Sequence, residues 1–397
     1  MFELEEVGAP DAETGSTVIK VVGVGGAGGN AVEHMIRERV GGVEFICCNT
    51  DAQALNKSNA HVKLQLGPGL GAGGKPEKAR DLALLDRERI AEALSGAHMV
   101  FITAGMGGGT GTGAGPVVAE VARELGILTV AVVTKPFEYE GKRKRLAEEG
   151  VAELARHVDS LIVILNEKLE EVLGDEVSML EAFQAADNVL RNAVGGIAEI
   201  INVPGLVNVD FEDVRTVMGE MGKAMMGSAV AAGVDRARVA AEEAVASPLL
   251  EGIELSGARG VLVNITASST LGLKEYKEVM KTIRQYTAPE ATVICGAVFD
   301  EAMEDQLRVT VVATGLGVVG VREAAKPAMR VVETIGLRTG TDNVPVFDPA
   351  ITQGSIDLSS VTSSARGGAP RNAQADAMAA SGVDKYDIPA FLRRQSD

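Results

Sequence analysis

The chain has 397 residues, a length that favours two globular domains and a tail over a single domain. Its net charge of −17, its aromatic content of 3% and its lack of tryptophan exclude a basic nucleic-acid surface and an aromatic stacking platform for single strands. We therefore expect no nucleic-acid partner, and cores built from aliphatic side chains.

Short β-branched runs alternate with amphipathic segments along the first half of the chain. Strands are expected at residues 16–26, 43–51, 62–66, 98–105, 127–136 and 160–166, with helices at 30–40, 76–94 and 116–126. Strands of this apolar kind, separated by helices, predict an α/β fold with a doubly wound, mostly parallel sheet. In such sheets ligands bind at the carboxyl ends of the strands.

A long, largely apolar helix is expected at 177–203, between this domain and a smaller α/β domain. The second domain has expected helices at 208–218, 238–247 and 273–286 and strands at 259–266, 291–300 and 307–314. The predicted organisation is a flexible N-terminus at 1–16, a nucleotide-binding domain at 17–176, the central helix, the second domain at 204–317, a flexible, disordered linker at 318–380 and a partner-binding peptide at 381–397.

Targeting and metal signals are lacking in the sequence. Cys47, Cys48 and Cys295 show no metal-ligand spacing, and no other side chains predict a metal site. The acidic start of the chain does not resemble a signal peptide, and no apolar run reaches the ~18 residues of a membrane span. We expect a soluble cytosolic protein that does not insert into a membrane.

Two glycine loops follow predicted strands. GVGGAG at 23–28 fits the dinucleotide pattern GxGxxG, with Asp51 where a ribose partner would stand, so an NAD-binding site is one interpretation. GMGGGTGTG at 105–113 has six glycines in nine positions. Two loops that each lead into a helix N-terminus suit a nucleotide with several phosphates, and Thr110 and Thr112 add hydroxyl donors. The alternative for the second loop is a tight turn without a ligand.

Two further motifs leave alternatives open. Residues 69–75 fit GxxxxGK, but Pro76 stands where Ser or Thr would hold magnesium, so we do not interpret them as a phosphate loop of that type. Asp210 and Asp213 lie three residues apart, on one face of a helix that begins there. They are either catalytic carboxylates or ordinary residues of a helix's first turn.

The motif GGGTGTG at 107–113 is the signature of the tubulin and FtsZ superfamily, and the surrounding sequence resembles the bacterial FtsZ family. The resemblance covers about 18–317 and the last dozen residues. It includes GVGGAGGNAVEHM, NTDAQAL, GMGGGTGTGAGPVVAEVA, TVAVVTKPF, NVDFEDVRTVM, SPLLE, RGVLVNITA and YDIPAFLRRQ.

The resemblance implies a GTPase that polymerises into head-to-tail filaments and forms the ring at the bacterial division site. It implies GTP and GDP as ligands, Mg²⁺ held through the phosphates, and K⁺ as a further candidate ion. The implied nucleotide contacts are Gly25, Gly26, Ala27, Gly28, Gly29 and Asn30; Ala72, Gly73 and Gly74 at the γ-phosphate; Gly108, Gly109, Thr110 and Gly111; Thr134; Glu140 at the ribose; Arg143 and Lys144 at the phosphates; and Asn166, Phe183 and Asp187 at the guanine.

The resemblance also implies a catalytic group and a tail contact. Asn208, Asp210 and Asp213 would enter the nucleotide site of the neighbouring subunit and polarise the attacking water. The tail would bind membrane-tethering partners such as FtsA, which places the protein in the cytoplasm at mid-cell, at the inner face of the membrane. Its contact residues would be Asp387, Ile388, Pro389, Phe391 and Leu392, with Arg393 and Arg394 adding charge.

The sequence departs from the family at the γ-phosphate loop, which is shortened before Gly71 and has Lys75 where asparagine is usual. Lys144, between Arg143 and Arg145, stands where a phosphate-facing arginine is usual, and which of the three contacts phosphate is open. Two other functions are alternatives to the polymerising GTPase at this point: a GTP-binding regulator that does not polymerise, and an NAD-dependent oxidoreductase.

Overall fold

The computed structural model describes residues 17–174, 177–203, 207, 209–220, 222–247 and 257–316, with the side chains of 170–173 excepted. All of them lie in one compact unit, residues 1–322. The catalytic candidate Asn208, the N-terminal segment expected at 1–16, and the linker and tail peptide expected at 318–397 lie outside the described residues.

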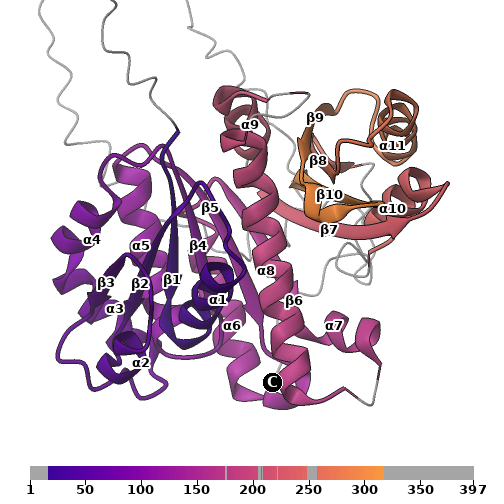
Figure 1. The fold of residues 1–397 in the computed structure, drawn as a ribbon. Coiled ribbons are helices and arrows are strands. Elements are labelled where there is room, and N and C mark those ends of the chain that lie inside the picture. Colours follow the sequence, from indigo (N-terminus) through magenta and orange to yellow (C-terminus); the bar gives the residue numbers. More distant parts are fainter. Residues whose placement is uncertain are drawn as a thin grey trace, which may run out of the picture. The chain divides into compact units, whose positions relative to one another are not determined.

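Six parallel strands form the sheet of the first half of the chain, as predicted (Figure 1). Their order is β3-β2-β1-β4-β5-β6. In β1, Val21 pairs in register with Phe45 of β2 on one side and Phe101 of β4 on the other. The six strands are β1 (Ile19–Val24), β2 (Glu44–Asn49), β3 (Val62–Gln65), β4 (Met99–Gly105), β5 (Leu128–Lys135) and β6 (Ser160–Leu165).

Helices cover both faces of this sheet, because successive side chains of each strand point to opposite sides. Val21 packs into a cluster with α1 (Gly25–Arg37) and α8 (Met179–Asn202). Val22, the next residue, packs into a second cluster with the helices of the other face. Those helices are α3 (Pro76–Leu85), α4 (Arg87–Leu94), α5 (Thr110–Glu124) and α6 (Lys142–Leu154). The short α2 (Ala52–Asn56) follows β2, and α7 (Asn166–Leu173) follows β6.

The helix expected at 76–94 is two helices, because Asp86 breaks it. The Asp86 carboxylate accepts a hydrogen bond from the Gly67 N–H over 2.9 Å and another from Arg89 Nη1 over 2.9 Å. This residue ends α3 and immediately precedes α4. A tertiary contact to a loop therefore interrupts a run whose helix propensity is continuous.

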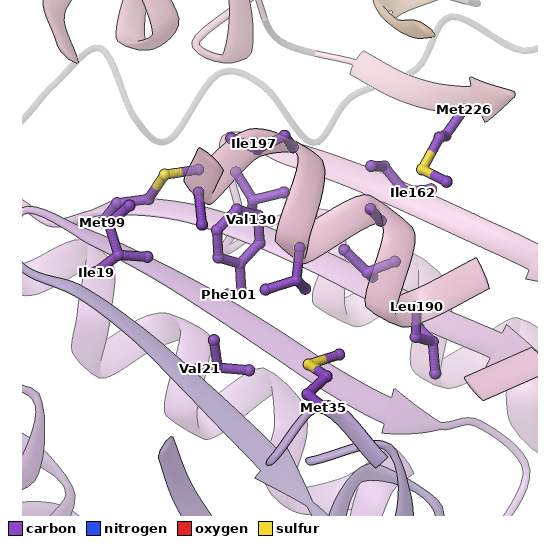
Figure 2. Packing of buried hydrophobic residues seen from close by; sticks show 14 of the residues in the cluster. Ile19, Val21, Met35, Met99, Phe101, Val130, Ile162, Leu190, Ile197 and Met226 are labelled. Atoms are coloured by element: carbon purple, nitrogen blue, oxygen red, sulfur yellow. The ribbon is translucent and has the colours of Figure 1, made fainter. Parts of the chain in front are cut away.

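The long helix α8 crosses the face of the sheet that α1 also covers (Figure 2). Ser178 caps it, since Ser178 Oγ accepts from the Glu181 N–H and Glu181 Oε2 accepts from the Ser178 N–H, a capping box. Leu190 and Ile197 are buried against Phe101 and Val130 of the sheet, whereas Phe183 in the second turn is 48% exposed. The helix is thus buried along its middle and open at its N-terminal end.

The remaining strands continue the same sheet, in the order β7-β10-β8-β9. Strand β7 pairs with β6 in parallel, from Ser160↔Gly222 to Ile162↔Ala224, and β10 runs antiparallel to both of its neighbours. The elements of this part are α9 (Phe211–Met218), β7 (Gly222–Ala232), α10 (Arg236–Val245), β8 (Gly260–Ala267), α11 (Leu273–Tyr286), β9 (Thr292–Phe299) and β10 (Gln306–Leu316), with a 3-10 turn at Glu301–Met303.

Strand β7 was not predicted from the sequence. Its residues GKAMMGSAVAA contain one β-branched side chain, Val230, and otherwise favour a helix or a loop. The strand forms because β10 pairs with it along most of its length. Among the described residues, no helix is long and apolar enough to cross a membrane.

Candidate nucleotide-binding site

The two glycine loops are the first turns of two helices. α1 begins at Gly25, directly after β1, and not at Asn30 as expected. α5 begins at Thr110, six residues before Pro116, where the sequence predicted its start. Neither helix has a side-chain cap, so the main-chain N–H groups of both first turns are free to bind an anion.

Most glycines of the second loop are required by packing within the protein. A Cβ atom on Gly113 would lie 2.0 Å from the Pro76 carbonyl oxygen, and one on Gly111 would lie 2.6 Å from that of Gly105. Cβ atoms on Gly105, Gly107 and Gly109 would also meet protein atoms within 3.0 Å. The interpretation that the whole run exists to approach phosphates is therefore too broad.

A smaller set of glycines faces open space. Added Cβ atoms would meet no protein atom within 4 Å at Gly26 and Gly29 of the first loop, at Gly73 and Gly74 before α3, or at Gly108. The first loop touches the second, since a Cβ on Gly25 would lie 2.9 Å from the Gly111 nitrogen, and Gly109 lies against Ala72. Glycines from three loops thus line a space that side chains would fill, which suits a bound phosphate chain.

The threonines of the second loop have different roles from those expected. Thr112 is buried, and its hydroxyl oxygen accepts a hydrogen bond of 2.9 Å from the Gly107 N–H. Thr110 shares a hydrogen bond of 2.7 Å with the hydroxyl of Thr50 at the end of β2. Thr112 therefore holds the loop in shape, and its hydroxyl does not face a ligand.

A cavity of about 370 Å³ lies at the carboxyl ends of β1, β4 and β5, where the sequence predicted a ligand. It contains the predicted residues Gly26, Ala27, Asn30, Thr134, Glu140, Arg143, Asn166, Phe183 and Asp187. The sequence analysis missed Ala104, Gly105, Met106, Pro136, Ala186 and Leu190, which complete its wall. These are small or apolar residues, and although Gly105 and Met106 open the second glycine loop, the sequence analysis assigned none of the six a specific contact.

The other predicted contacts lie beside this cavity. Gly25 and Gly29 line a second cavity of about 220 Å³ that shares Gly26 and Asn30 with the first. The remaining predicted contacts line neither cavity and lie in the glycine loops, apart from Lys144: Gly28, Ala72, Gly73, Gly74, Gly108, Gly109, Thr110 and Gly111.

The far end of the larger cavity offers acceptors for a base. The buried Asn166 Oδ1 has no hydrogen-bond partner within the described residues. Burial raises the pKa of the Asp187 carboxyl to about 6, and the nearby His34 and Arg37 counteract the rise. Guanine presents N–H donors at N1 and at its 2-amino group, so an unpaired amide oxygen and a carboxylate fit this base. Phe183, packed edge to face on Phe137 at 6.4 Å, adds an aromatic wall.

Of the three basic residues Arg143, Lys144 and Arg145, one reaches the cavity and two do not. Arg143 lines the cavity and pairs with Glu140, whose other carboxylate oxygen accepts from the Phe137 N–H over 3.0 Å. Lys144 pairs with Glu138, and Arg145 lies 3.8 Å from Glu149. Arg143 is thus the basic residue in position to meet a phosphate.

Asp51 has a structural task. Its carboxylate caps α2, since Oδ1 accepts hydrogen bonds from the N–H groups of Gln53 and Ala54 over 2.8 and 3.4 Å. Asp51 does not line either of the two cavities at the glycine loops. The ribose contact that the NAD interpretation assigned to this residue is therefore not supported.

Asp210 and Asp213 lie at the amino ends of the strands, whereas the cavity lies at their carboxyl ends. Asp210 caps α9, its Oδ1 accepting from the Asp213 N–H over 2.8 Å, and both residues are exposed. Phe211 of this helix packs edge to face on His98, the residue before β4, with 6.1 Å between ring centroids. Strand β4 runs seven residues from this amino end to Gly105, which lines the cavity. About 20 Å therefore separate the first turn of α9 from the cavity.

The sheet is mostly parallel, and glycine loops at two helix N-termini lie beside a cavity at the carboxyl ends of its strands. These features define a nucleotide-binding α/β protein. Residues 18–174 match the Tubulin/FtsZ family, GTPase domain, and residues 222–317 match the FtsZ family, C-terminal domain. The chain belongs to the tubulin/FtsZ family.

Several relatives are similar over most of the chain. The cell division protein FtsZ of Pseudomonas aeruginosa is 53% identical over 416 residues, which cover 100% of both chains. That of Coxiella burnetii is 59% identical over 322 residues, 80% of this chain and 82% of the relative. A solved structure, an empty FtsZ dimer from M. jannaschii, is 44% identical, covers 76% of this chain and 89% of its own, and has a TM-score of 0.73.

The function follows from the family together with the site. The chain is a tubulin-like GTPase of the cell-division type, and its ligands are GTP and GDP. The NAD-dependent oxidoreductase interpretation is thereby set aside, as is that of a GTP-binding regulator that does not polymerise.

Proposed function

We propose that this GTPase assembles head to tail and hydrolyses GTP at the contact between subunits, with Asp210 and Asp213 of one subunit acting on the nucleotide of the next. The observation that carries the proposal is their position. Both carboxylates are exposed near the amino ends of the strands, too far from the cavity at the carboxyl ends to act on their own subunit's nucleotide. Stacking subunits along the strand direction brings the amino ends of one sheet against the carboxyl ends of the next.

The proposed role of these two carboxylates is to orient and polarise the water that attacks the γ-phosphate. Phosphoryl transfer depends on positioning and charge stabilisation, so a carboxylate that arrives with the next subunit can switch hydrolysis on. Asp213 is the main candidate, because the Asp210 carboxylate already accepts a main-chain hydrogen bond. Asn208 is included on the resemblance alone.

Within one subunit, the proposal assigns the phosphates to the glycine loops and Arg143, the ribose to Glu140, and the guanine to Asn166, Phe183 and Asp187. Mg²⁺ is proposed to be held through the phosphate oxygens, and K⁺ is a further candidate. Among the described residues, no cluster of three or more His, Cys, Asp or Glu side chains could hold a metal. Lys75, exposed beside Gly74, adds a positive charge at the γ-phosphate loop.

The first test is GTP hydrolysis per subunit against protein concentration, with light scattering recorded on the same samples in Mg²⁺ and K⁺. We expect a specific rate that rises sharply above a threshold concentration together with the scattering. A specific rate that does not depend on concentration would contradict a shared site.

A second test separates the two halves of the site. Asp213→Ala should bind GDP normally yet lose turnover, and Gly108→Val should lose nucleotide binding. Mixed one to one, they should recover part of the activity, because the intact pocket of the first meets the intact carboxylate of the second. Glu212→Ala is the matched control and should keep its turnover, because it removes an exposed carboxylate from the same turn of α9 and leaves Asp210 and Asp213 unchanged. Mixtures no more active than the separate variants would refute the split site.

The tail is proposed to recruit the filament to the cytoplasmic face of the membrane at mid-cell. The supporting sequence is YDIPAFLRRQ, through Asp387, Ile388, Pro389, Phe391 and Leu392 and a tethering partner such as FtsA. Removal of the last dozen residues should leave GTP hydrolysis intact and abolish recruitment. Membrane-attached rings formed by the truncated chain would show that this assignment is wrong.

A further inference from the structure

One hydrogen bond joins the helix that carries the phosphate loop to the helix that carries the base-binding residues. His34 Nε2, on α1, donates to Asn188 Oδ1, on α8, over 2.7 Å. α1 begins with the glycines of the first loop, and α8 supplies Phe183 and Asp187 to the cavity. His34 and Asn188 line neither that cavity nor the smaller one beside it.

The buried part of the contact between these two helices is apolar, and His34 and Arg37 of α1 also lie near enough to Asp187 of α8 to favour its charged form. Val32 and Met35 of α1 belong to the same buried cluster as Leu190 and Val194 of α8. Apolar contact is strong but non-directional, so it tolerates small sliding of one helix along the other. A hydrogen bond is short and directional and therefore fixes their register.

Register matters here because a nucleotide is held at two separate places. Its phosphates meet the first turn of α1, whereas its base meets a turn of α8. A carboxylate must lie within hydrogen-bond distance of the guanine N1–H and 2-amino group while the phosphates are engaged, and a shift of about 1 Å would separate them. Asn188 directly follows Asp187, so its bond to α1 acts on the base-binding turn itself.

We propose that His34 is a positioning residue for guanine recognition: through Asn188 it holds Asp187 at a fixed distance from the phosphate loop, and it thereby sets selectivity for the 2-amino group. The inference rests on the proposed role of Asp187 and adds a residue that does not touch the nucleotide. It also gives a role to a polar pair that lies beside the buried apolar contact of α1 and α8.

The test compares two nucleotides that differ only at the 2-amino group. Dissociation constants for GDP and for inosine diphosphate are measured by equilibrium binding, at protein concentrations below assembly, and the ratio of the two is taken as the selectivity. His34→Ala should lower the selectivity by about threefold to tenfold, the range expected when a neutral hydrogen bond is lost. Thermal unfolding without nucleotide verifies folding.

Four further variants extend the test. His34→Gln keeps a donor at similar reach and should retain selectivity within about twofold. Asn188→Ala should match His34→Ala, and the double variant should lose little more, because both substitutions break the same bond. Gln184→Ala is the matched control, an exposed α8 position one turn before Asn188, and should bind as the unmodified chain does. If His34→Ala does not fold, Asn188→Ala carries the test.

The outcomes distinguish a failure of the His34 inference from a failure of the proposed role of Asp187. If His34→Ala weakens both nucleotides by the same factor, its role is structural and the inference is wrong. If Asp187→Asn abolishes selectivity while the His34 and Asn188 variants keep it, the proposed role of Asp187 stands and only the positioning fails. If Asp187→Asn leaves selectivity unchanged, the assignment of the base site itself is wrong.

Discussion

Thr112 and Gly107 are joined by a hydrogen bond of 2.9 Å in which the threonine hydroxyl oxygen accepts the glycine N–H. Both residues are buried, Gly107 in the loop before α5 and Thr112 in the first turn of that helix. Gly107 has a φ of +94°, in the region that favours glycine, and the bond holds it there. The shape of the phosphate loop therefore depends on a side chain that faces away from the ligand.

Replacing Thr112 by Val should remove this acceptor with little change in volume. The buried Gly107 N–H would lose its partner, and the free energy of unfolding should fall by about 1–3 kcal/mol, with weaker GDP binding. Thr112→Ser keeps the hydroxyl and should lose about 1 kcal/mol through its missing methyl group. Urea unfolding and GDP titration of both variants measure this, and GDP binding weakened equally by Val and by Ser would contradict it.

Glycines within one loop should respond differently to the same added methyl group. Gly108→Ala places a Cβ in open space, so stability should change by less than about 0.5 kcal/mol while GDP affinity falls about tenfold. Gly113→Ala places a Cβ 2.0 Å from the Pro76 carbonyl oxygen and should lower stability by about 1–3 kcal/mol or prevent folding. Thermal unfolding without nucleotide distinguishes them, and unchanged GDP binding by Gly108→Ala would argue against the phosphate site.

Arg143 and Lys144 offer a comparison of neighbouring charges. Arg143 lines the cavity whereas Lys144 pairs with Glu138 outside it, so Arg143→Gln should weaken GDP binding by about tenfold and Lys144→Gln by less than about twofold. Both substitutions remove one positive charge, so a long-range electrostatic effect would be similar for the two. Comparable losses would therefore show that the loop acts through net charge and not through a contact by Arg143.

Much of the nucleotide-binding half could be predicted because its signals are local. Runs such as MVFITAG and IKVVGV are apolar enough to be buried in a parallel sheet, and their glycine turns mark the strand ends where a ligand binds. The break at Asp86 and the strand β7 could not be predicted, because each depends on a partner distant in sequence. The break depends on the Gly67 N–H, and β7 depends on pairing with β10.

The base site could be predicted only through the resemblance. On residues alone, Asp187 is a polar position on a long helix, and Asn166 is the first residue after a strand. They meet because α8 begins beside the carboxyl ends of the strands, which no local pattern indicates. His34 lies within the stretch GVGGAGGNAVEHM, but the sequence assigns that histidine no role. The domain boundaries remain a prediction, because strand β7 pairs with β6 and the sheet is continuous across them.

The raised pKa of Asp187 predicts opposite effects on stability and on binding. Burial raises the pKa of this carboxyl from 3.8 to about 6, so the folded chain binds a proton that the unfolded chain has released between these values. The nucleotide-free protein should therefore lose stability as the pH rises from about 4 to 6, and keep that loss above pH 6. Guanine binding should change the other way, because only the ionised carboxylate accepts both guanine donors. Below pH 6, GDP affinity should fall by up to about tenfold per unit.

Asp187→Asn isolates this group from other titrations. An amide of the same shape carries no charge to desolvate, so at pH 7.5 the nucleotide-free variant should unfold at a higher temperature than the unmodified chain, while its GDP affinity should be lower. His34 and Arg37, which favour the charged carboxylate, are unchanged in the variant, so the contributions of all groups other than Asp187 remain in both profiles. The measurement is thermal unfolding and GDP binding from pH 5 to 8. A variant whose binding profile keeps the full slope of the unmodified chain would show that another group controls the pH dependence.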